Sequence, residues 1–345
     1  MFLRDCWYVA AWSHDVGSQP LGVRVLGEPI VLFRGADGTL AALEDRCAHR
    51  WAPLSLGRVE DGQLRCMYHG LKYDTAGRCT HVPGPDAAAS DIKVRRYPSQ
   101  ERDGWAWIWM GAAARADESL IPTAFGLDNP RWTMRSGQID YDADYRLLND
   151  NLCDLSHVDF VHEESLGLAT GGGWSHSYPE VKRLERGLRI QRWFVGKPAS
   201  PRNPALVDTY STYDYLAPGI FIMENLSFEH GEAQRSKGQA PTGTPIAHRV
   251  EQQAVTPMSE KTTRYFYATG FDARSMPQKL IDSIFAVIQQ TFDEDHRMID
   301  AQQEIWNLTP PEHDMVFLPQ DRAPALFRTV MSRLVKAESS GQPSR

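Results

Sequence analysis

Two short segments of the chain each pair a cysteine with a histidine. Cys47-Ala48-His49 is followed, after sixteen intervening residues, by Cys66-Met67-Tyr68-His69. Each segment offers one thiolate and one imidazole, so two such loops facing each other would present two sulfur and two nitrogen donors to a metal. Zinc accepts this donor set. A [2Fe–2S] cluster with two cysteines on one iron and two histidines on the other accepts it equally well.

The spacing of these four residues distinguishes the two metals. Zinc fingers usually pair cysteine with cysteine and histidine with histidine within one segment. Here each segment mixes the two types, so each iron of a cluster would be ligated from both loops, which is the Rieske arrangement. We therefore predict that Cys47, His49, Cys66 and His69 bind a Rieske [2Fe–2S] cluster. A structural zinc site is the alternative.

A second group of possible metal ligands lies near the middle of the chain. His157 and His162 are five residues apart in a segment with helical spacing of its apolar residues. On an ideal helix they would point about 140° apart, so the helix must end or distort near His162 if both are to reach one ion. Asp154 comes one helical turn before His157. Its carboxylate is predicted to orient the His157 imidazole.

A long helix near the C-terminus supplies a third ligand. Pro277 is predicted to open this helix, which runs to about Trp306. Asp295 falls on the apolar stripe of the helix, where a carboxylate is costly unless it is paired or binds metal. Asp293, Glu294 and His296 lie to the sides of the stripe. We predict that His157, His162 and Asp295 bind a mononuclear Fe(II), because two histidines and one carboxylate are typical of non-haem Fe(II) oxygenases.

These two groups fall in regions of different predicted structure. The first 115 residues show short β-prone runs separated by Gly and Pro turns, which indicates a small barrel or sandwich. The polar stretch 114–119 marks the boundary. After it come the helical segment at 145–160, strand-like runs between 178 and 272, and the long helix. We expect two domains, 1–115 and 116–345.

Composition excludes several classes of protein. The chain has 345 residues, a net charge of -7 and 42% hydrophobic residues, which argues against disorder and against binding to nucleic acid or anionic membranes. Its least polar stretch, 104–114, is too short to span a membrane. Five cysteines are a poor disulfide framework, so we expect a soluble, cytoplasmic protein. The sequence contains no nucleotide-binding glycine motif, so we expect the chain itself to bind no nucleotide.

Several of these features together resemble a known family. The two Cys–His segments, the run from Asn151 to His162 and the pair Glu294-Asp295 are similar to those of the oxygenase components of Rieske non-haem iron oxygenases. Within that family the chain looks most like the group of vanillate O-demethylase, toluenesulfonate methyl-monooxygenase and dicamba O-demethylase. The resemblance is strongest over 1–115, 140–165 and 290–305.

The resemblance implies an α+β fold with a particular assembly. An N-terminal Rieske β domain would be followed by a helix-grip (START-like) catalytic domain with an antiparallel sheet and a long C-terminal helix. A homotrimer would place the cluster of one subunit beside the iron of the next. Asp154 would then bridge His157 of its own subunit to the neighbour's cluster histidine His69, and Asn151 would assist near the iron.

The same resemblance implies a function. The chain would be a terminal oxygenase component that inserts one oxygen atom of O2 into an aromatic substrate, by O-demethylation or methyl hydroxylation of an aromatic acid. A flavin/iron–sulfur reductase, with or without a ferredoxin, would supply electrons. A ring-hydroxylating dioxygenase and a Rieske electron carrier without oxygenase activity are the alternatives. Substrate contacts are expected between residues 165 and 295, with the following candidates: Trp193, Asn225, His248, Arg249 and Gln252.

Overall fold

The computed structural model describes residues 2–84, 91–167, 172–200, 203–273 and 278–340, and the chain divides into two compact units. The first contains Met1–Thr123 and Thr256–Glu260, and the second contains Ala124–Val255 and Lys261–Arg345. The boundary predicted after residue 115 falls inside the first unit. The reason is that the segment beyond it is tied back: the Trp7 indole donates to the Asp117 carbonyl at 2.8 Å.

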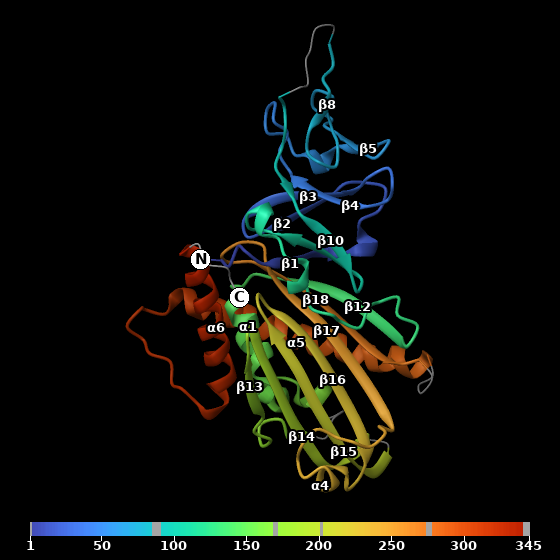
Figure 1. The fold of residues 1–345 in the computed structure, drawn as a ribbon. Coiled ribbons are helices and arrows are strands. Elements are labelled where there is room, and N and C mark those ends of the chain that lie inside the picture. Colours follow the sequence, from blue (N-terminus) through green and yellow to red (C-terminus); the bar gives the residue numbers. More distant parts are fainter. Residues whose placement is uncertain (1, 85–90, 168–171, 201–202, 274–277, 341–345) are drawn as a thin grey trace. The chain divides into compact units, whose positions relative to one another are not determined.

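The first unit is built from three small antiparallel sheets, as expected for a Rieske β domain (Figure 1). The first sheet has the order β1-β11-β10, with bounds Trp7–Trp12, Trp105–Trp109 and Ser99–Arg102. The second has the order β2-β3-β4-β9, with bounds Leu21–Val25, Glu28–Arg34, Leu40–Glu44 and Arg96–Tyr97. The third has the order β5-β6-β7-β8, with bounds Arg58–Glu60, Gln63–Arg65, Lys72–Tyr73 and Cys79–His81. Short 3₁₀ turns connect them: Ser13–Asp15, Leu54–Leu56, Ala113–Arg115 and Glu118–Leu120.

The first unit also includes a segment that is distant in sequence. Residues 256–260 form the turn between two late strands, and they bond to the start of the chain. The Leu26 amide donates to the Pro257 carbonyl at 2.8 Å, and the Thr256 hydroxyl donates to the Val9 carbonyl at 2.7 Å. The pattern of the sequence gives no sign of this return, because the first contact joins two backbone atoms and the second needs only one hydroxyl against a backbone carbonyl.

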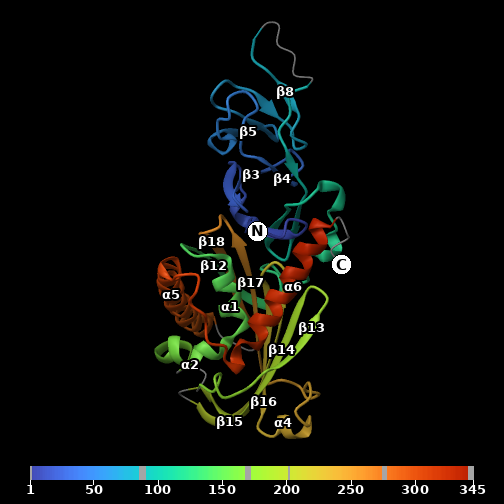
Figure 2. The ribbon, with the colours of Figure 1, turned by 90° about the vertical axis from the view of Figure 1, so that its left-hand side faces the viewer.

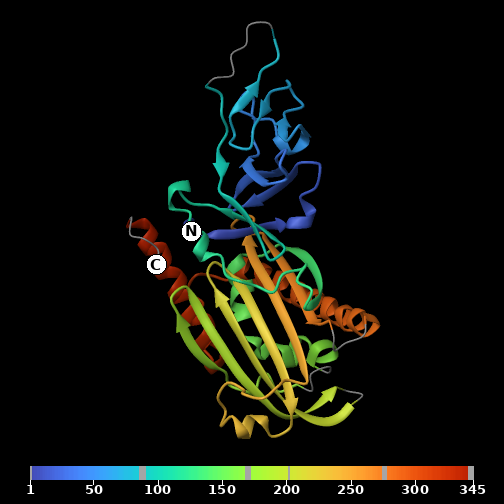
Figure 3. The same ribbon diagram turned by 45° about the vertical axis from the view of Figure 1, so that its right-hand side comes forward.

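The second unit is a seven-stranded antiparallel sheet with helices on one face (Figure 2). The strand order is β12-β18-β17-β16-β15-β14-β13. Their bounds are, in that order, Trp132–Tyr141, Thr263–Asp272, Ala247–Pro257, Ile220–Glu229, Asn203–Leu216, Gly187–Ser200 and Glu180–Leu184. Figure 3 shows the sheet with the helices behind it. This is the helix-grip architecture with an antiparallel sheet that was expected.

Three longer helices cover the sheet: α1 (Tyr145–Cys153), α5 (Gln278–Leu308) and α6 (Arg322–Ser339). Every second residue of the central strands points toward them, as the two-residue period of a strand requires. Ile190, Tyr213 and Met223 are such residues, and they share one buried core with Ile288 and Phe327 of the helices. The long C-terminal helix is thus confirmed; Pro277, its predicted first residue, lies outside the described residues.

The predicted helix over 145–160 is broken in the structure. α1 ends at Cys153, and Asp154 adopts an extended conformation with φ -121° and ψ 98°. The 3₁₀ turn Leu155–His157, the short helix α2 (Val158–Val161) and the π-helical turn Glu163–Gly167 follow. Asp154 accepts the Ser156 amide at 2.9 Å, so it caps a new turn rather than continuing the old helix. A further short helix, α4, covers Glu232–Arg235, and a 3₁₀ turn at Pro319–Asp321 precedes α6.

Asp150 of α1 is a half-buried carboxylate at the contact between α1 and α6. Arg328 of α6 donates to it at 2.8 Å, yet burial raises the pKa of Asp150 to about 6. Because the folded protein then binds the proton more tightly than the unfolded chain, the ionised carboxylate destabilises the fold above pH 6.

We expect Asp150→Asn to raise the free energy of unfolding at pH 7 by about 1 kcal/mol, allowing for partial exposure of the side chain. The advantage should shrink as the pH falls from about 6 to 4, where the wild-type carboxyl is protonated in the folded state and about half protonated in the unfolded chain. Denaturant titrations at pH 4 and pH 7 measure this. An equal effect at both values would contradict it.

No helix among the described residues is both long enough and apolar enough to cross a membrane.

Candidate metal centres

The two Cys–His segments form the same backbone turn. In the first loop the Cys47 amide donates to the Ala52 carbonyl and the Trp51 amide donates to the Cys47 carbonyl, both at 2.9 Å. In the second loop Cys66 makes the corresponding pair of bonds with Leu71 and Gly70, again at 2.9 Å. The loops follow strands β4 and β6, and both cysteines are buried at 1% exposure.

The fourth residue after each cysteine has left-handed backbone. Trp51 has φ 58° and Gly70 has φ 77°. A tryptophan in this conformation is strained, and strain of this kind concentrates at functional sites. Trp51 is 77% exposed, so the turn, and not packing of the indole, requires this left-handed conformation.

The turn brings the two predicted histidines together. The ring centroids of His49 and His69 are 4.5 Å apart in an edge-to-face arrangement, and both residues are exposed. Two buried sulfurs and two exposed imidazoles match the donor set that would hold a Rieske cluster. The structure therefore brings all four predicted cluster residues into one site.

Tyr73 lies beside the sulfur of Cys47. Its hydroxyl oxygen accepts the Ala48 amide at 3.2 Å and lies 3.3 Å from the Cys47 sulfur, so its proton is free to point at a thiolate. Hydrogen bonds to cluster sulfurs raise the reduction potential, because they stabilise the added negative charge.

We expect Tyr73→Phe to lower the potential of the cluster by about 20–60 mV, corresponding to one lost hydrogen bond. Protein-film voltammetry measures this, and the cluster EPR signal checks that the cluster remains. Tyr68→Phe is a suitable control because Tyr68 is exposed and lies against His69 rather than against a sulfur. A higher potential in Tyr73→Phe would contradict the assignment.

The second predicted set also meets in the structure. One ligand atom each from His157, His162 and Asp295 lies within 4.8 Å of the others. Asp295 Oδ1 is 3.6 Å from His157 Nε2, and Asp295 Oδ2 is 3.3 Å from His162 Nε2. His162 and Asp295 are 1% and 7% exposed, so the carboxylate on the apolar stripe is paired as expected.

The other ring nitrogen of each histidine is held by an oxygen. His157 Nδ1 is 2.6 Å from the Asp154 carbonyl, and His162 Nδ1 is 2.9 Å from Glu294 Oε2. An acceptor at Nδ1 fixes the proton there and leaves Nε2 as a lone-pair donor toward the centre of the group. Two such imidazoles and one carboxylate fit a mononuclear iron with open coordination positions.

The predicted role of the Asp154 carboxylate toward His157 of its own chain is wrong. The carboxylate accepts the amide and the hydroxyl of Ser156, both at 2.9 Å, and only the backbone carbonyl of Asp154 contacts the His157 ring. The prediction assumed an unbroken helix, in which Asp154 and His157 would share a face. Because α1 ends at Cys153, the carboxylate turns away and is partly exposed.

Asn151 and Glu294 complete the surroundings of the group. Asn151 Nδ2 donates to Asp295 Oδ1 at 3.0 Å, so it lies beside a predicted iron ligand. Glu294 was predicted to lie beside the stripe. In the structure the Glu294 carboxylate accepts from His162 Nδ1 at 2.9 Å and from the Ser165 hydroxyl at 2.6 Å. The sequence contained one signal for this contact, the adjacency of Glu294 to the predicted ligand Asp295.

The five candidate substrate residues divide between the two faces of the sheet. Asn225 and Arg249 are register partners that point toward the helices, on the same side as Met223. His248 pairs with Glu224 at 2.8 Å, and Gln252 accepts two loop amides, both on the opposite side.

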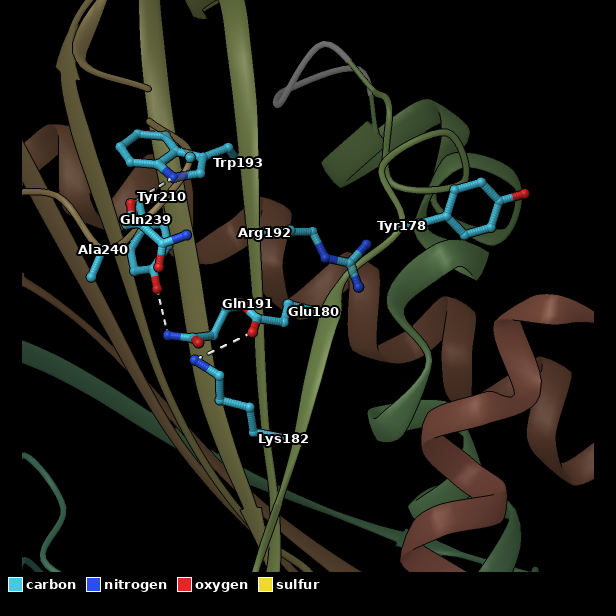
Figure 4. A pocket seen from close by; sticks show the side chains of 10 residues that line it. Tyr178, Glu180, Lys182, Gln191, Arg192, Trp193, Tyr210, Gln239 and Ala240 are labelled. Atoms are coloured by element: carbon cyan, nitrogen blue, oxygen red, sulfur yellow. Dashed lines mark hydrogen bonds and ion pairs between the residues drawn. The ribbon is translucent and has the colours of Figure 1, made fainter. Parts of the chain in front are cut away.

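Trp193 also faces away from the helices and lines a pocket of about 240 Å³ there. Figure 4 shows Gln191 and Trp193 on one side of strand β14 and Arg192 pointing to the other. The pocket is lined by Tyr178, Lys182, Gln191, Trp193, Tyr210 and Gln239 among others, and it contains none of the His–His–Asp group.

A β domain with paired Cys–His loops, joined to a helix-grip domain with a His–His–Asp group, defines an oxygenase component of the Rieske type. Comparisons with known proteins agree. Residues 6–98 match the Rieske [2Fe–2S] domain, and residues 141–337 match the vanillate O-demethylase oxygenase C-terminal domain. The chain therefore belongs to the Rieske non-haem iron oxygenases with a vanillate O-demethylase type of catalytic domain.

Individual relatives align over nearly the whole chain. The toluene-4-sulfonate monooxygenase system iron-sulfur subunit TsaM1 of Comamonas testosteroni is 33% identical and covers 99% of both chains. The vanillate O-demethylase oxygenase subunit of Pseudomonas sp. strain HR199 is 32% identical, over 98% of this chain and 96% of that one. The crystal structure of dicamba monooxygenase with non-heme iron and dicamba is 26% identical, with a TM-score of 0.81 over 99% of both chains. The protein is thus an oxidoreductase that carries a Rieske cluster and a mononuclear iron.

Proposed function

We propose that the protein is the terminal oxygenase of a multicomponent system and inserts one oxygen atom of O2 into the methyl or methoxy group of an aromatic acid. The observation that carries this proposal is the convergence of His157 Nε2, His162 Nε2 and Asp295, with both Nδ1 atoms held by oxygens. Two relatives are named for toluene-4-sulfonate and for vanillate, and both compounds are aromatic acids, which supports this class of substrate.

In this proposal each residue has one task. Cys47, Cys66, His49 and His69 hold the cluster, and His157, His162 and Asp295 hold the iron. When bound, the cluster delivers single electrons and the iron offers open positions for O2. Asn151 keeps the Asp295 carboxylate in place, and Glu294 keeps the His162 ring from turning. These last two contacts preserve the geometry while the substrate enters.

The reaction balances with two electrons from NAD(P)H. One oxygen atom enters a C–H bond of the substrate, and the other takes two protons and two electrons and leaves as water. From a methoxy group the hydroxylated product releases formaldehyde and a phenol. From an aryl methyl group it is a benzylic alcohol. A flavin/iron–sulfur reductase supplies the electrons, and since its donor is NAD(P)H we propose a cytoplasmic location.

We propose further that the protein works as a homotrimer. In it the Asp154 carboxylate, which has no role toward His157 within its own chain, faces the partner subunit's His69. The partial exposure of Asp154 and the exposure of both cluster imidazoles support this. So does the apolar stretch Met315–Leu318, in which each side chain is at least 54% exposed.

A product screen tests the proposal. The holoenzyme would be incubated with reductase, NADH and O2 on vanillate, 4-methoxybenzoate and toluene-4-sulfonate, with formaldehyde and benzylic alcohol as readouts. One labelled oxygen atom from ¹⁸O2 in the benzylic alcohol is the expected result, whereas the phenol formed by O-demethylation keeps its own unlabelled oxygen and the label leaves with formaldehyde. Two labelled atoms in a dihydrodiol would indicate a ring-hydroxylating dioxygenase. An electron carrier would show cluster reduction with no product and no iron beyond the two of the cluster.

A further inference from the structure

The helix-facing surface of the sheet carries four polar side chains in a line, which we call the polar row. It consists of Arg192 on β14, Ser211 on β15, Asn225 on β16 and Arg249 on β17. Each is the direct register partner of the next. Neighbouring strands lie about 4.8 Å apart, so the four side chains stand side by side across the sheet.

Every member of the polar row has a buried donor without a partner. The orphaned atoms are Arg192 Nε, Ser211 Oγ, Asn225 Nδ2 and Arg249 Nε. Arg192, Ser211 and Asn225 are only 5%, 1% and 8% exposed. A buried polar atom without a partner is uncommon, because it costs free energy and calls for an explanation. All four atoms can donate a hydrogen bond, so what satisfies them together is a group rich in acceptors.

Arg192 brings a buried positive charge that Asp154 and Asp159 attract only at a distance and that shares a side-chain hydrogen bond with Tyr213. Its Nη1 donates to the carbonyls of Trp174 and Ser177, at 3.1 and 3.2 Å, and its guanidinium lies 5.1 Å from the centroid of the Trp174 ring. Among the described residues no carboxylate forms an ion pair with it, and burial lowers its pKa. Arg249, by contrast, is paired with Glu251 at 3.2 Å. A buried cation of this kind favours an anionic ligand.

Two hydrogen bonds place the end of α1, which precedes the segment with the metal ligands, over β15 close to the polar row. The Tyr215 hydroxyl donates to Asn149 Oδ1 at 2.6 Å, and the Tyr213 hydroxyl donates to the Cys153 carbonyl at 3.2 Å. α1 therefore runs antiparallel to β15: residue numbers rise along α1 as they fall along β15. The segment beyond Cys153, which leads to His157, stays near the row, because Asp154 and Asp159 both act electrostatically on Arg192.

A loop also connects Arg192 to the segment between the two histidines. The Asp159 carboxylate accepts the amides of Gly173 and Ser175, at 3.0 and 2.8 Å. The same loop provides the Trp174 carbonyl that holds Arg192. The iron-ligand segment and the cation are therefore fixed relative to each other through one set of hydrogen bonds.

We propose that the polar row is the substrate's anion subsite, in which Arg192, Ser211 and Asn225 bind the carboxylate or sulfonate of an aromatic acid. The inference rests on the proposed function and adds to it the residues that choose the substrate. Aromatic and apolar side chains adjoin the row in the same core, namely Trp174, Phe194, Tyr213 and Met223. They would pack against the ring, so that the end of the molecule opposite the anion faces the metal.

The test compares matched anionic and neutral ligands on the anaerobic holoenzyme by calorimetry. The ligands are 4-methoxybenzoate, toluene-4-sulfonate and neutral 4-methylanisole. We expect Arg192→Gln to weaken binding of both anions by about 10- to 100-fold, the effect of one charged hydrogen-bonding partner. Binding of 4-methylanisole should be unchanged. Asn225→Asp, which adds a negative charge without changing the shape, should also reject the anions selectively.

Arg189→Gln is the matched control, because Arg189 lies on the same strand three residues earlier and points to the other face, where it pairs with Asp214 at 2.7 Å. It should leave all three affinities unchanged. Equal losses for anions and 4-methylanisole in Arg192→Gln would mean that Arg192 only holds its loop, and would overturn the proposal. So would failure of the wild-type enzyme to bind either anion. Oxygen uptake on 4-methylanisole reports separately whether the protein is an oxygenase.

Discussion

Asp295→Asn is expected to stop turnover while leaving the cluster intact. The Asp295 carboxylate is 7% exposed and lies 3.3 Å from His162 Nε2 and 3.6 Å from His157 Nε2. An asparagine has nearly the same shape but no charge, and its single carbonyl oxygen is a weaker ligand for a divalent ion. Because disturbing only the surroundings of a ligand costs about 10- to 100-fold, loss of the ligand itself should exceed about 100-fold.

Three measurements on one preparation check this expectation. Iron analysis should give only the two irons of the cluster, the Rieske EPR signal should be unchanged, and oxygen uptake should be lost. Asp293→Asn is the matched control, since it removes the same charge from an exposed position two residues earlier on the same helix. A variant that keeps the mononuclear iron and turns over normally would rule out Asp295 as a ligand.

The second large effect is expected from Asp154→Asn. Asparagine caps a helical turn as well as aspartate does, so the bond to the Ser156 amide should persist. The carbonyl that holds His157 is backbone and is untouched. Both metal centres should therefore stay loaded. Only the negative charge disappears, and if Asp154 faces the partner subunit's His69, we expect electron transfer between the centres to slow by about 10- to 100-fold.

Single-turnover kinetics on the pre-reduced enzyme measures this step, with cluster oxidation followed by absorbance. Asp144→Asn is the matched control, because Asp144 caps α1 in the same manner, accepting the Arg146 amide at 2.9 Å. Unchanged cluster oxidation in Asp154→Asn would remove the proposed bridge. Loss of the mononuclear iron in that variant would assign Asp154 a local structural role instead.

The ligand residues themselves could be predicted because their types are chemically rare. Two mixed Cys–His segments have few other uses, and a carboxylate such as Asp295 on an apolar stripe requires an explanation. The spacing also predicted that the helix must break if His157 and His162 were to meet. The two-domain division followed from the change in pattern near residue 115, although the structure places the boundary at Thr123.

What could not be predicted depends on where a helix or strand ends. Because the helix breaks at Asp154, the backbone carbonyl of Asp154 contacts His157 in place of its carboxylate. The residue types around Asp154 do not predict this break. The contact of Glu294 with His162 needs the crossing of α2 and α5. The polar row needs the register of four strands, because Arg192 and Asn225 are 33 residues apart in the sequence and become neighbours only through Ser211.

The return of residues 256–260 to the first unit has a consequence for how the protein is made. A ribosome adds about 5–20 residues per second, so the last piece of the cluster-bearing unit emerges on the order of ten seconds after Thr123. Throughout that time the backbone atoms that will bond to Pro257 and Thr256 have no partner. We therefore expect the nascent cluster domain to mature late, after most of the catalytic sheet has been synthesised. Expression of residues 1–123 alone should yield a domain that loses its cluster more readily than the full chain does.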